Sequence, residues 1–244
     1  MKKVTIVGIG PGKYEQMTIE AVQCLKNCDL IVGYTVYVDL IKDSFPDKKI
    51  IMTPMKQEVE RCTIALQEAN KGFNVAMVCS GDGVVYGMAG LVYELSSGYE
   101  DVEIEVVSGV TAALSGGAVI GAPLTHDFAV ISLSDLLTPW ETIEKRIRGA
   151  AMGDFAMAIY NPSSKKRADY LEKACKVILE YQSPSLICGY VKNIGREGET
   201  FQVLTLEELQ MTSVDMFTTV FIGNSQTKRI RGKMITPRGY RYEQ

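Results

Sequence analysis

Short apolar runs alternate with longer segments of helical periodicity in the first half of the chain. The runs predicted as buried strands are residues 4–7, 30–32, 50–52, 75–79 and 104–107. The segments predicted as helices are residues 18–26, 57–71, 86–95 and 111–119. Continuous apolar strands separated by helices indicate a mostly parallel sheet that is covered on both faces.

A second series of elements begins near Phe128. It predicts strands over 129–133, 155–160, 185–191, 201–204 and 219–223, and helices over 140–151, 167–181 and 207–210. Between the two series, residues 116–124 are rich in Gly, Ala and Pro. The pattern therefore predicts two α/β domains, residues 1–118 and 119–244, with mostly parallel or mixed sheets.

Composition narrows the class of protein. The chain has 244 residues, 46% of them hydrophobic and 23% charged, with a formal net charge of −3. These values are typical of a folded globular protein, and they disfavour disorder and nucleic-acid binding through bulk positive charge. No apolar run approaches the roughly 18 residues of a membrane span, and the run at 4–9 leads directly into glycines rather than a signal-peptide cleavage site. We expect a cytoplasmic protein without membrane or nucleic-acid partners.

The cysteines and the single histidine bear on metal binding. No two cysteines form a C-x-x-C pair, and His126 is the only histidine, so we expect no protein-bound metal and reduced, buried thiols. The six cysteines are Cys24, Cys28, Cys62, Cys79, Cys175 and Cys188.

Charge is unevenly distributed along the chain. Residues 228–244 carry six Lys and Arg against Glu243, a local charge of +5, so the remainder carries −8. A solvated basic end explains this bias, and a contact surface for an anionic substrate is the alternative.

Three glycine-rich turns follow predicted strands, at 8–12 (GIGPG), 80–89 (SGDGVVYGMA) and 107–113 (VSGVTAA). The carboxyl ends of strands are where open α/β sheets bind ligands. Lys13 stands where a dinucleotide fingerprint needs its third glycine, and no P-loop ending is present. Asp82 would accept hydrogen bonds from a ligand or cap the following helix. The small residues of the third turn would admit a ligand or allow close helix–strand packing.

A fourth segment, residues 122–140, contains the only His and the only Trp near Asp127 and Asp135. A Ser-His-Asp hydrolase would use such residues, but the chain has no G-x-S-x-G motif.

In this order, the segments GIGPG, SGDGVVYGMAG, VSGVTAA, GAPLTHDFAVISLSDLLTPW, IYNPSS and GYVKNIGREGE resemble the tetrapyrrole (corrin/porphyrin) methyltransferase family over essentially the whole chain. The resemblance implies a class III methyltransferase-like fold, in which two α/β domains hold S-adenosylmethionine in the cleft between them, and a homodimer acting on an anionic tetrapyrrole. The fourth and fifth segments favour methylation at C17 of a precorrin-3B-type or cobalt-precorrin-3-type substrate, with coupled ring contraction, in cobalamin biosynthesis.

The family motifs assign the cofactor-binding residues. Carried over position by position, they are Gly10, Pro11, Gly81, Asp82, Val85, Thr111, Ala112, Tyr160 and Asn161. Two positions depart from the family pattern: Gly83-Val84 replaces Pro-Gly, and Ser108 replaces a proline. Both changes affect loop stiffness more than ligand chemistry.

Catalysis divides between cofactor and protein. The cofactor carries the activated methyl group, and the protein must align the reactants and exclude water. Ring contraction calls for proton transfer, for which His126, Asp127 and Asp135 are the candidates. A structural role for His126 is the alternative. The cations expected to pair with substrate carboxylates are Lys165, Lys166, Arg167, Arg196 and Arg238.

Three other functions stay open at this point. They are a sibling methyltransferase acting at another precorrin carbon, a methyltransferase for a protein side chain as in diphthine synthesis, and a noncatalytic tetrapyrrole carrier. A substrate that contains cobalt and a metal-free one fit the sequence equally.

Overall fold

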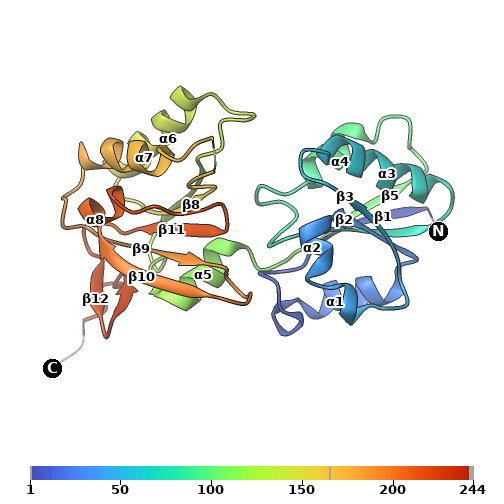
Figure 1. The fold of residues 1–244 in the computed structure, drawn as a ribbon, viewed down its shortest axis with the longest axis horizontal. Coiled ribbons are helices and arrows are strands. Elements are labelled where there is room, and N and C mark those ends of the chain that lie inside the picture. The colour runs from blue at the N-terminus through green and yellow to red at the C-terminus, as the bar shows by residue number, and fades with distance from the viewer. Residues whose placement is uncertain (1, 165, 242–244) are drawn as a thin grey trace. The chain divides into compact units, whose positions relative to one another are not determined.

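The computed structural model describes residues 2–164 and 166–241 (Figure 1). Contacts along the chain divide it into two compact units, Met1–Ala112 and Ala113–Gln244. The domain limits expected from the sequence, 1–118 and 119–244, stay a prediction. Among the described residues, no helix is long and apolar enough to cross a membrane.

The first unit is built on a five-stranded parallel sheet with the order β3-β2-β4-β1-β5. The strands are β1 (Lys3–Gly8), β2 (Leu30–Tyr34), β3 (Lys49–Thr53), β4 (Asn74–Cys79) and β5 (Glu103–Val107). All five predicted strands are confirmed, because each apolar run forms a strand of this sheet.

Helices cover both faces of this sheet (Figure 1). In β4, Val75 and Met77 pack with α3 and α4, whereas Ala76 and Val78 pack with α1 and α2. This alternation is the period of a strand that is buried on both faces. The helices are η1 (Tyr14–Gln16), α1 (Ile19–Asn27), α2 (Thr35–Asp39), η2 (Lys42–Ser44), α3 (Glu58–Asn70) and α4 (Ala89–Leu95).

The second unit is built on a mixed sheet with the order β10-β9-β11-β8-β7. Only the β7–β8 pair of this sheet is parallel. The strands are β7 (Phe128–Ser132), β8 (Ala156–Tyr160), β9 (Ile187–Lys192), β10 (Thr200–Thr205) and β11 (Thr218–Ile222). The predicted α/β class with mostly parallel or mixed sheets is therefore confirmed.

The described residues of this half of the chain form four helices: α5 (Ala112–Ile120), α6 (Trp140–Met152), α7 (Tyr170–Leu179) and α8 (Leu206–Gln210). Residues of α6, α7 and α8 form one apolar cluster with the sheet. In α5, a Cβ added at Gly116 would lie 2.7 Å from Ile194 Cδ1 and 3.0 Å from Phe221 Cζ. The glycine therefore lets this helix approach the side chains of Ile194 and Phe221 closely.

A third sheet, with the order β12-β13-β6, was not predicted. It joins β6 (Gly121–Ala122) to the hairpin of β12 (Lys228–Ile230) and β13 (Lys233–Ile235). Beside it, Thr236 Oγ1 donates to Pro123 O at 2.7 Å, and Lys233 Nζ donates to Val119 O at 2.6 Å. Part of the basic C-terminal segment therefore has a structural role, because it is hydrogen-bonded to the backbone of residues 119–123.

Candidate functional site

Two of the glycine-rich turns are joined at the carboxyl edge of the first sheet, where β4 and β1 are neighbours. The Gly10 N–H donates to Gly81 O at 3.0 Å, and the Gly81 N–H donates to Gly10 O at 2.8 Å. Both glycines have left-handed backbones, with φ of +67° and +69°. Since that conformation favours glycine, the two loops are fixed to each other by residues that few side chains would replace.

The third turn, after β5, contacts the other two through bare backbone. A Cβ added at Gly109 would lie 2.0 Å from Gly81 O, and one added at Gly8 would lie 2.5 Å from Gly109 N. No real side chain fits at these separations. The glycines at these positions therefore allow three loops from three adjacent strands to touch.

Asp82 fastens these loops with its carboxylate and is only 8% exposed. Its Oδ1 accepts hydrogen bonds from the N–H groups of Val84 (2.7 Å) and Val85 (3.1 Å). Its Oδ2 accepts one from the Gly109 N–H at 2.9 Å. Both oxygens are thus engaged by backbone donors, and one of the three bonds crosses to the neighbouring loop.

The alternative role of Asp82 as a helix cap is wrong. Helix α4 begins at Ala89, after Met88, and not at residue 86 as the apolar pattern predicted. Tyr86 has a φ of 54°, which no residue of a right-handed helix adopts. Residues 83–88 therefore form a turn, and Asp82 stabilises that turn.

Further predicted residues lie against this group of loops. A Cβ added at Gly81 would lie 3.6 Å from Thr111 Cα and 3.8 Å from Ala112 N. Buried Pro11 follows Gly10 directly. The structure therefore brings together seven of the nine predicted cofactor residues: Gly10, Pro11, Gly81, Asp82, Val85, Thr111 and Ala112.

Gln16 is a further residue of this group of loops, and the sequence motifs did not identify it. Its side-chain Oε1 is buried and has no hydrogen-bond partner among the described residues. Its carbonyl oxygen would lie 2.7 Å from a Cβ added at Gly10, so the residue belongs to the same group of loops. A buried acceptor of this kind is satisfied by a water or a ligand donor. Glutamine is a common residue, and no sequence signal distinguished this one.

The other two predicted cofactor residues end strand β8 in the second unit. Tyr160 Oη accepts a hydrogen bond from the Ala113 N–H at 2.7 Å, in the first turn of α5. Asn161 has a left-handed backbone with φ of 51°, and its Nδ2 donates to Ser132 Oγ at 2.9 Å. Both side chains are therefore held in place at the carboxyl end of a strand.

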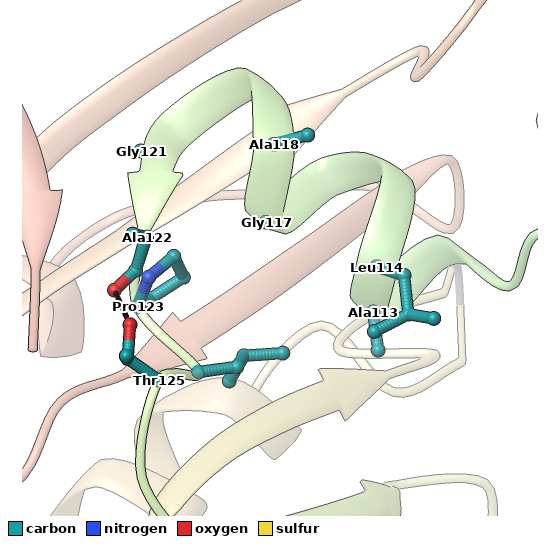
Figure 2. A pocket seen from close by; sticks show the side chains of 9 residues that line it. Ala113, Leu114, Gly117, Ala118, Gly121, Ala122, Pro123 and Thr125 are labelled. Carbon is teal, nitrogen blue, oxygen red and sulfur yellow. Dashed lines mark hydrogen bonds between the residues drawn. The ribbon is translucent and has the colours of Figure 1, made fainter. Parts of the chain in front are cut away.

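The second unit has an open hollow of about 220 Å³ (Figure 2). His126 and Asp127 come directly after its lining residue Thr125 in the sequence. Within the described part of the chain, neither side chain makes a hydrogen bond or ion pair. The hollow is lined by Ala113, Leu114, Gly117, Ala118, Gly121, Ala122, Pro123, Leu124 and Thr125. Of these lining residues, Thr125 is the one with a polar side chain.

Asp135, the third predicted acid–base residue, is held by two partners. Its carboxylate accepts from Arg167 Nε at 2.5 Å and from Tyr170 Oη at 2.6 Å. The Tyr170 hydroxyl and, more weakly, the Arg167 charge hold the pKa of this carboxyl below its ordinary value. Among the described residues, no hydrogen bond or ion pair joins Asp135 to His126 or Asp127, and the acid–base roles of the three residues stay a prediction.

The predicted carboxylate-binding cations have different environments. Arg167 is paired with Asp135, and the Arg196 guanidinium lies 5.8 Å from the centre of the Phe217 ring. Arg238 is exposed and donates to Thr125 O at 2.9 Å. Lys166 is exposed, and Lys165 lies outside the described residues.

The six thiols form no disulfide with one another, and five of them are buried, whereas Cys24 is partly exposed. Burial raises the pKa of Cys28 to about 11 and that of Cys62 to about 12, so these thiols stay protonated and unreactive near neutral pH. Among the described residues, no three His, Cys, Asp or Glu side chains are grouped closely enough to hold a metal ion.

Comparison with solved structures defines the class of fold. The crystal structure of the methyltransferase CobJ superposes with a TM-score of 0.89 and 36% identity, over 96% of this chain and 99% of that one. The architecture of two α/β units is therefore that of a methyltransferase.

Comparison of sequences defines the family. The model for tetrapyrrole (corrin/porphyrin) methylases matches residues 3–210. The "probable cobalt-factor III C(17)-methyltransferase" of Salmonella typhimurium is 44% identical over 97% of this chain and 99% of its own length. The precorrin-3B C(17)-methyltransferase of a Sinorhizobium species is 37% identical over 96% of each chain. The chain belongs to the tetrapyrrole methylase family, which confirms the resemblance seen in its motifs.

Proposed function

We propose that this protein is an S-adenosylmethionine-dependent methyltransferase that methylates C17 of a cobalt-factor III or precorrin-3B tetrapyrrole in cobalamin biosynthesis, with coupled ring contraction. The observation that carries this proposal is end-to-end similarity to relatives named for C17 methylation. The similarity is not confined to the cofactor motifs, because it covers 97% of this chain and therefore also includes residues 122–164, which contain the segments that favour C17 methylation.

The loops of the first unit fit the cofactor. S-adenosylmethionine has an ammonium group and an adenine amine that donate hydrogen bonds, and Gln16 Oε1 is a buried acceptor in need of a donor. Its planar adenine needs close approach to bare backbone, which Gly10 and Gly81 provide. We assign the binding surface to these loops, with Pro11, Val85, Thr111 and Ala112 as lining residues and Asp82 as the residue that fixes them.

The roles of Tyr160 and Asn161 stay a prediction from the family motifs. Their positions at the end of β8, and their hydrogen bonds to Ala113 and Ser132, support that prediction because they place two ordered polar side chains at a strand's carboxyl end.

The residues of this chain have two tasks in the reaction: they align the cofactor with the substrate, and they transfer the proton that ring contraction requires. The bound cofactor supplies a methyl group already activated on a sulfonium. The glycine-rich loops hold the cofactor and exclude water from it. The His126 imidazole nitrogens and the Asp127 carboxylate are free of described partners, so we propose that they accept or donate the proton that ring contraction requires.

The test is turnover by the purified protein. It is incubated with S-adenosylmethionine and either the cobalt-containing or the metal-free trimethylated intermediate, and the products are identified by mass spectrometry and NMR. One added methyl group, located on C17, supports the proposal, and the preferred substrate assigns the route. Methylation at a different carbon would make the protein a sibling enzyme. Tight tetrapyrrole binding without turnover would make it a carrier.

A further inference from the structure

Residues 133–139, between β7 and α6, expose two adjacent leucines. We call this segment the leucine loop. Leu136 is 65% exposed and Leu137 is 98% exposed. Single exposed apolar residues are common on protein surfaces. Two adjacent exposed leucines present a larger apolar surface than either does alone, and exposed apolar surfaces mark contacts with ligands or partners.

The leucine loop is braced at both ends. At its start, Leu133 is fully buried and its N–H donates to Tyr160 O at 2.9 Å. In its middle, Asp135 accepts hydrogen bonds from Arg167 Nε (2.5 Å) and Tyr170 Oη (2.6 Å). At its end, the Trp140 ring lies 4.7 Å from the Tyr170 ring, centroid to centroid. These contacts tie the loop to α7 and to the segment after β8.

The loop lies at an edge where a ligand is expected. Strands β7 and β8 are parallel neighbours, so the segments that follow Ser132 and Tyr160 leave the sheet at the same edge. Asn161, with its left-handed backbone, is hydrogen-bonded to Ser132 across that edge. Lys166, an exposed cation, belongs to the segment after β8.

A tetrapyrrole has the chemistry that this edge would recognise. Its macrocycle has broad apolar faces, and its rim carries carboxylates. Exposed leucine side chains contact an apolar face, and a nearby lysine pairs with a rim carboxylate. S-adenosylmethionine, in contrast, is small and largely polar.

We propose that Leu136 and Leu137 contact the apolar face of the tetrapyrrole substrate, and that Asp135, held by Arg167 and Tyr170, positions them. The inference rests on the proposed function and names the residues that select its substrate. Asp135 is then a positioning residue, because both of its partners belong to the protein and neither is a reacting group.

The first experiment replaces Leu137 by serine. Because the side chain is almost fully exposed, the fold should tolerate the change. We expect KM for the tetrapyrrole to rise about tenfold, the effect of losing one leucine contact, while the Kd for S-adenosylmethionine stays unchanged. Met211→Ser is the matched control, since Met211 is 81% exposed at the end of α8, and it should leave both constants unchanged.

The outcomes separate this inference from the proposed function. If the unaltered protein does not methylate the tetrapyrrole, the proposed function fails. If it does, and Leu137→Ser has an unchanged KM, the inference alone fails. A change in sedimentation of Leu137→Ser with an unchanged KM would assign the leucines to contact between two copies and also overturn the inference.

The second experiment tests positioning against proton transfer. Asp135→Asn and Tyr170→Phe should each raise KM for the tetrapyrrole several-fold and leave the pH profile of kcat unchanged. Asp135→Glu, which keeps a carboxylate, should restore part of the affinity. Loss of kcat at constant KM, or a lost limb of the pH profile, would show that Asp135 transfers a proton and would overturn its assignment as a positioning residue.

Discussion

Asp82→Asn tests whether this carboxylate fastens the cofactor loops. The native side chain accepts hydrogen bonds from three backbone N–H groups, of Val84, Val85 and Gly109. An asparagine has one acceptor oxygen, so its NH₂ group must face at least one of these donors. Because Asp82 is 8% exposed, water does not replace the lost bond.

The expected magnitude follows from the number of bonds. A hydrogen bond to a charged group is worth about 1.5–3 kcal/mol, so asparagine should lower the free energy of unfolding by about that amount. Alanine leaves all three donors without the carboxylate and should cost about 3–6 kcal/mol, less than the sum because the loops relax. The Kd for S-adenosylmethionine should rise tenfold or more, since tenfold corresponds to about 1.4 kcal/mol spent on ordering the loops.

The assays are urea unfolding and calorimetric titration of the cofactor. Asp47→Asn is the control, because Asp47 is exposed and outside the site, and its effect on unfolding should stay within about 0.5 kcal/mol. Unchanged stability and unchanged affinity in Asp82→Asn would refute the fastening role. Weaker binding at full stability would also refute it, because that result requires direct contact between Asp82 and the cofactor.

Three further substitutions test other parts of the site. Gly109→Ala should abolish cofactor binding, because its Cβ would lie 2.0 Å from a carbonyl oxygen, whereas Gly90→Ala, with open space around it, should bind normally and melt no lower in a calorimetric scan. The Tyr170 hydroxyl and the Arg167 charge hold the pKa of the Asp135 carboxyl below its ordinary value, so the contribution of these contacts to stability is present above the ordinary carboxyl pKa of about 3.9 and is lost as pH falls through the lowered one. Tyr170→Phe should therefore destabilise the protein at pH 7 and progressively less below pH 4, and a difference independent of pH in urea unfolding would contradict this. His126→Ala should lower the rate of ring contraction about 100-fold or more and spare cofactor binding, and rates of methyl transfer and of ring contraction that both stay unchanged would remove His126 from the mechanism.

The strands of both main sheets were predictable from short runs rich in apolar residues, although polar residues such as Glu105 in β5 and Gln202 in β10 interrupt two of them. The third sheet was not, since β6 has two residues and the three residues of β12 are all exposed, so neither shows an apolar period. Helix α2 has only five residues, which is too short for an amphipathic pattern. The start of α4 was misplaced because the left-handed backbone at Tyr86 leaves no trace in hydrophobicity.

The loops of the candidate site were predictable from the sequence, but the contacts between them were not. The glycine motifs follow buried strands, which placed them at the carboxyl edge of a sheet. The bond from Gly109 to Asp82 spans 27 residues and depends on the strand order β4-β1-β5, which one sequence does not specify. The buried acceptor of Gln16 depends on the packing around it and has no sequence signal.

The most direct test of the central claim uses S-adenosylmethionine labelled with ¹³C in its methyl group. The purified protein is incubated with this cofactor and with cobalt-factor III or precorrin-3B, and the product is examined by NMR. We expect one labelled methyl group on C17 of a ring-contracted macrocycle. A label on any other carbon, or no transfer to either substrate while the cofactor is bound, would contradict it.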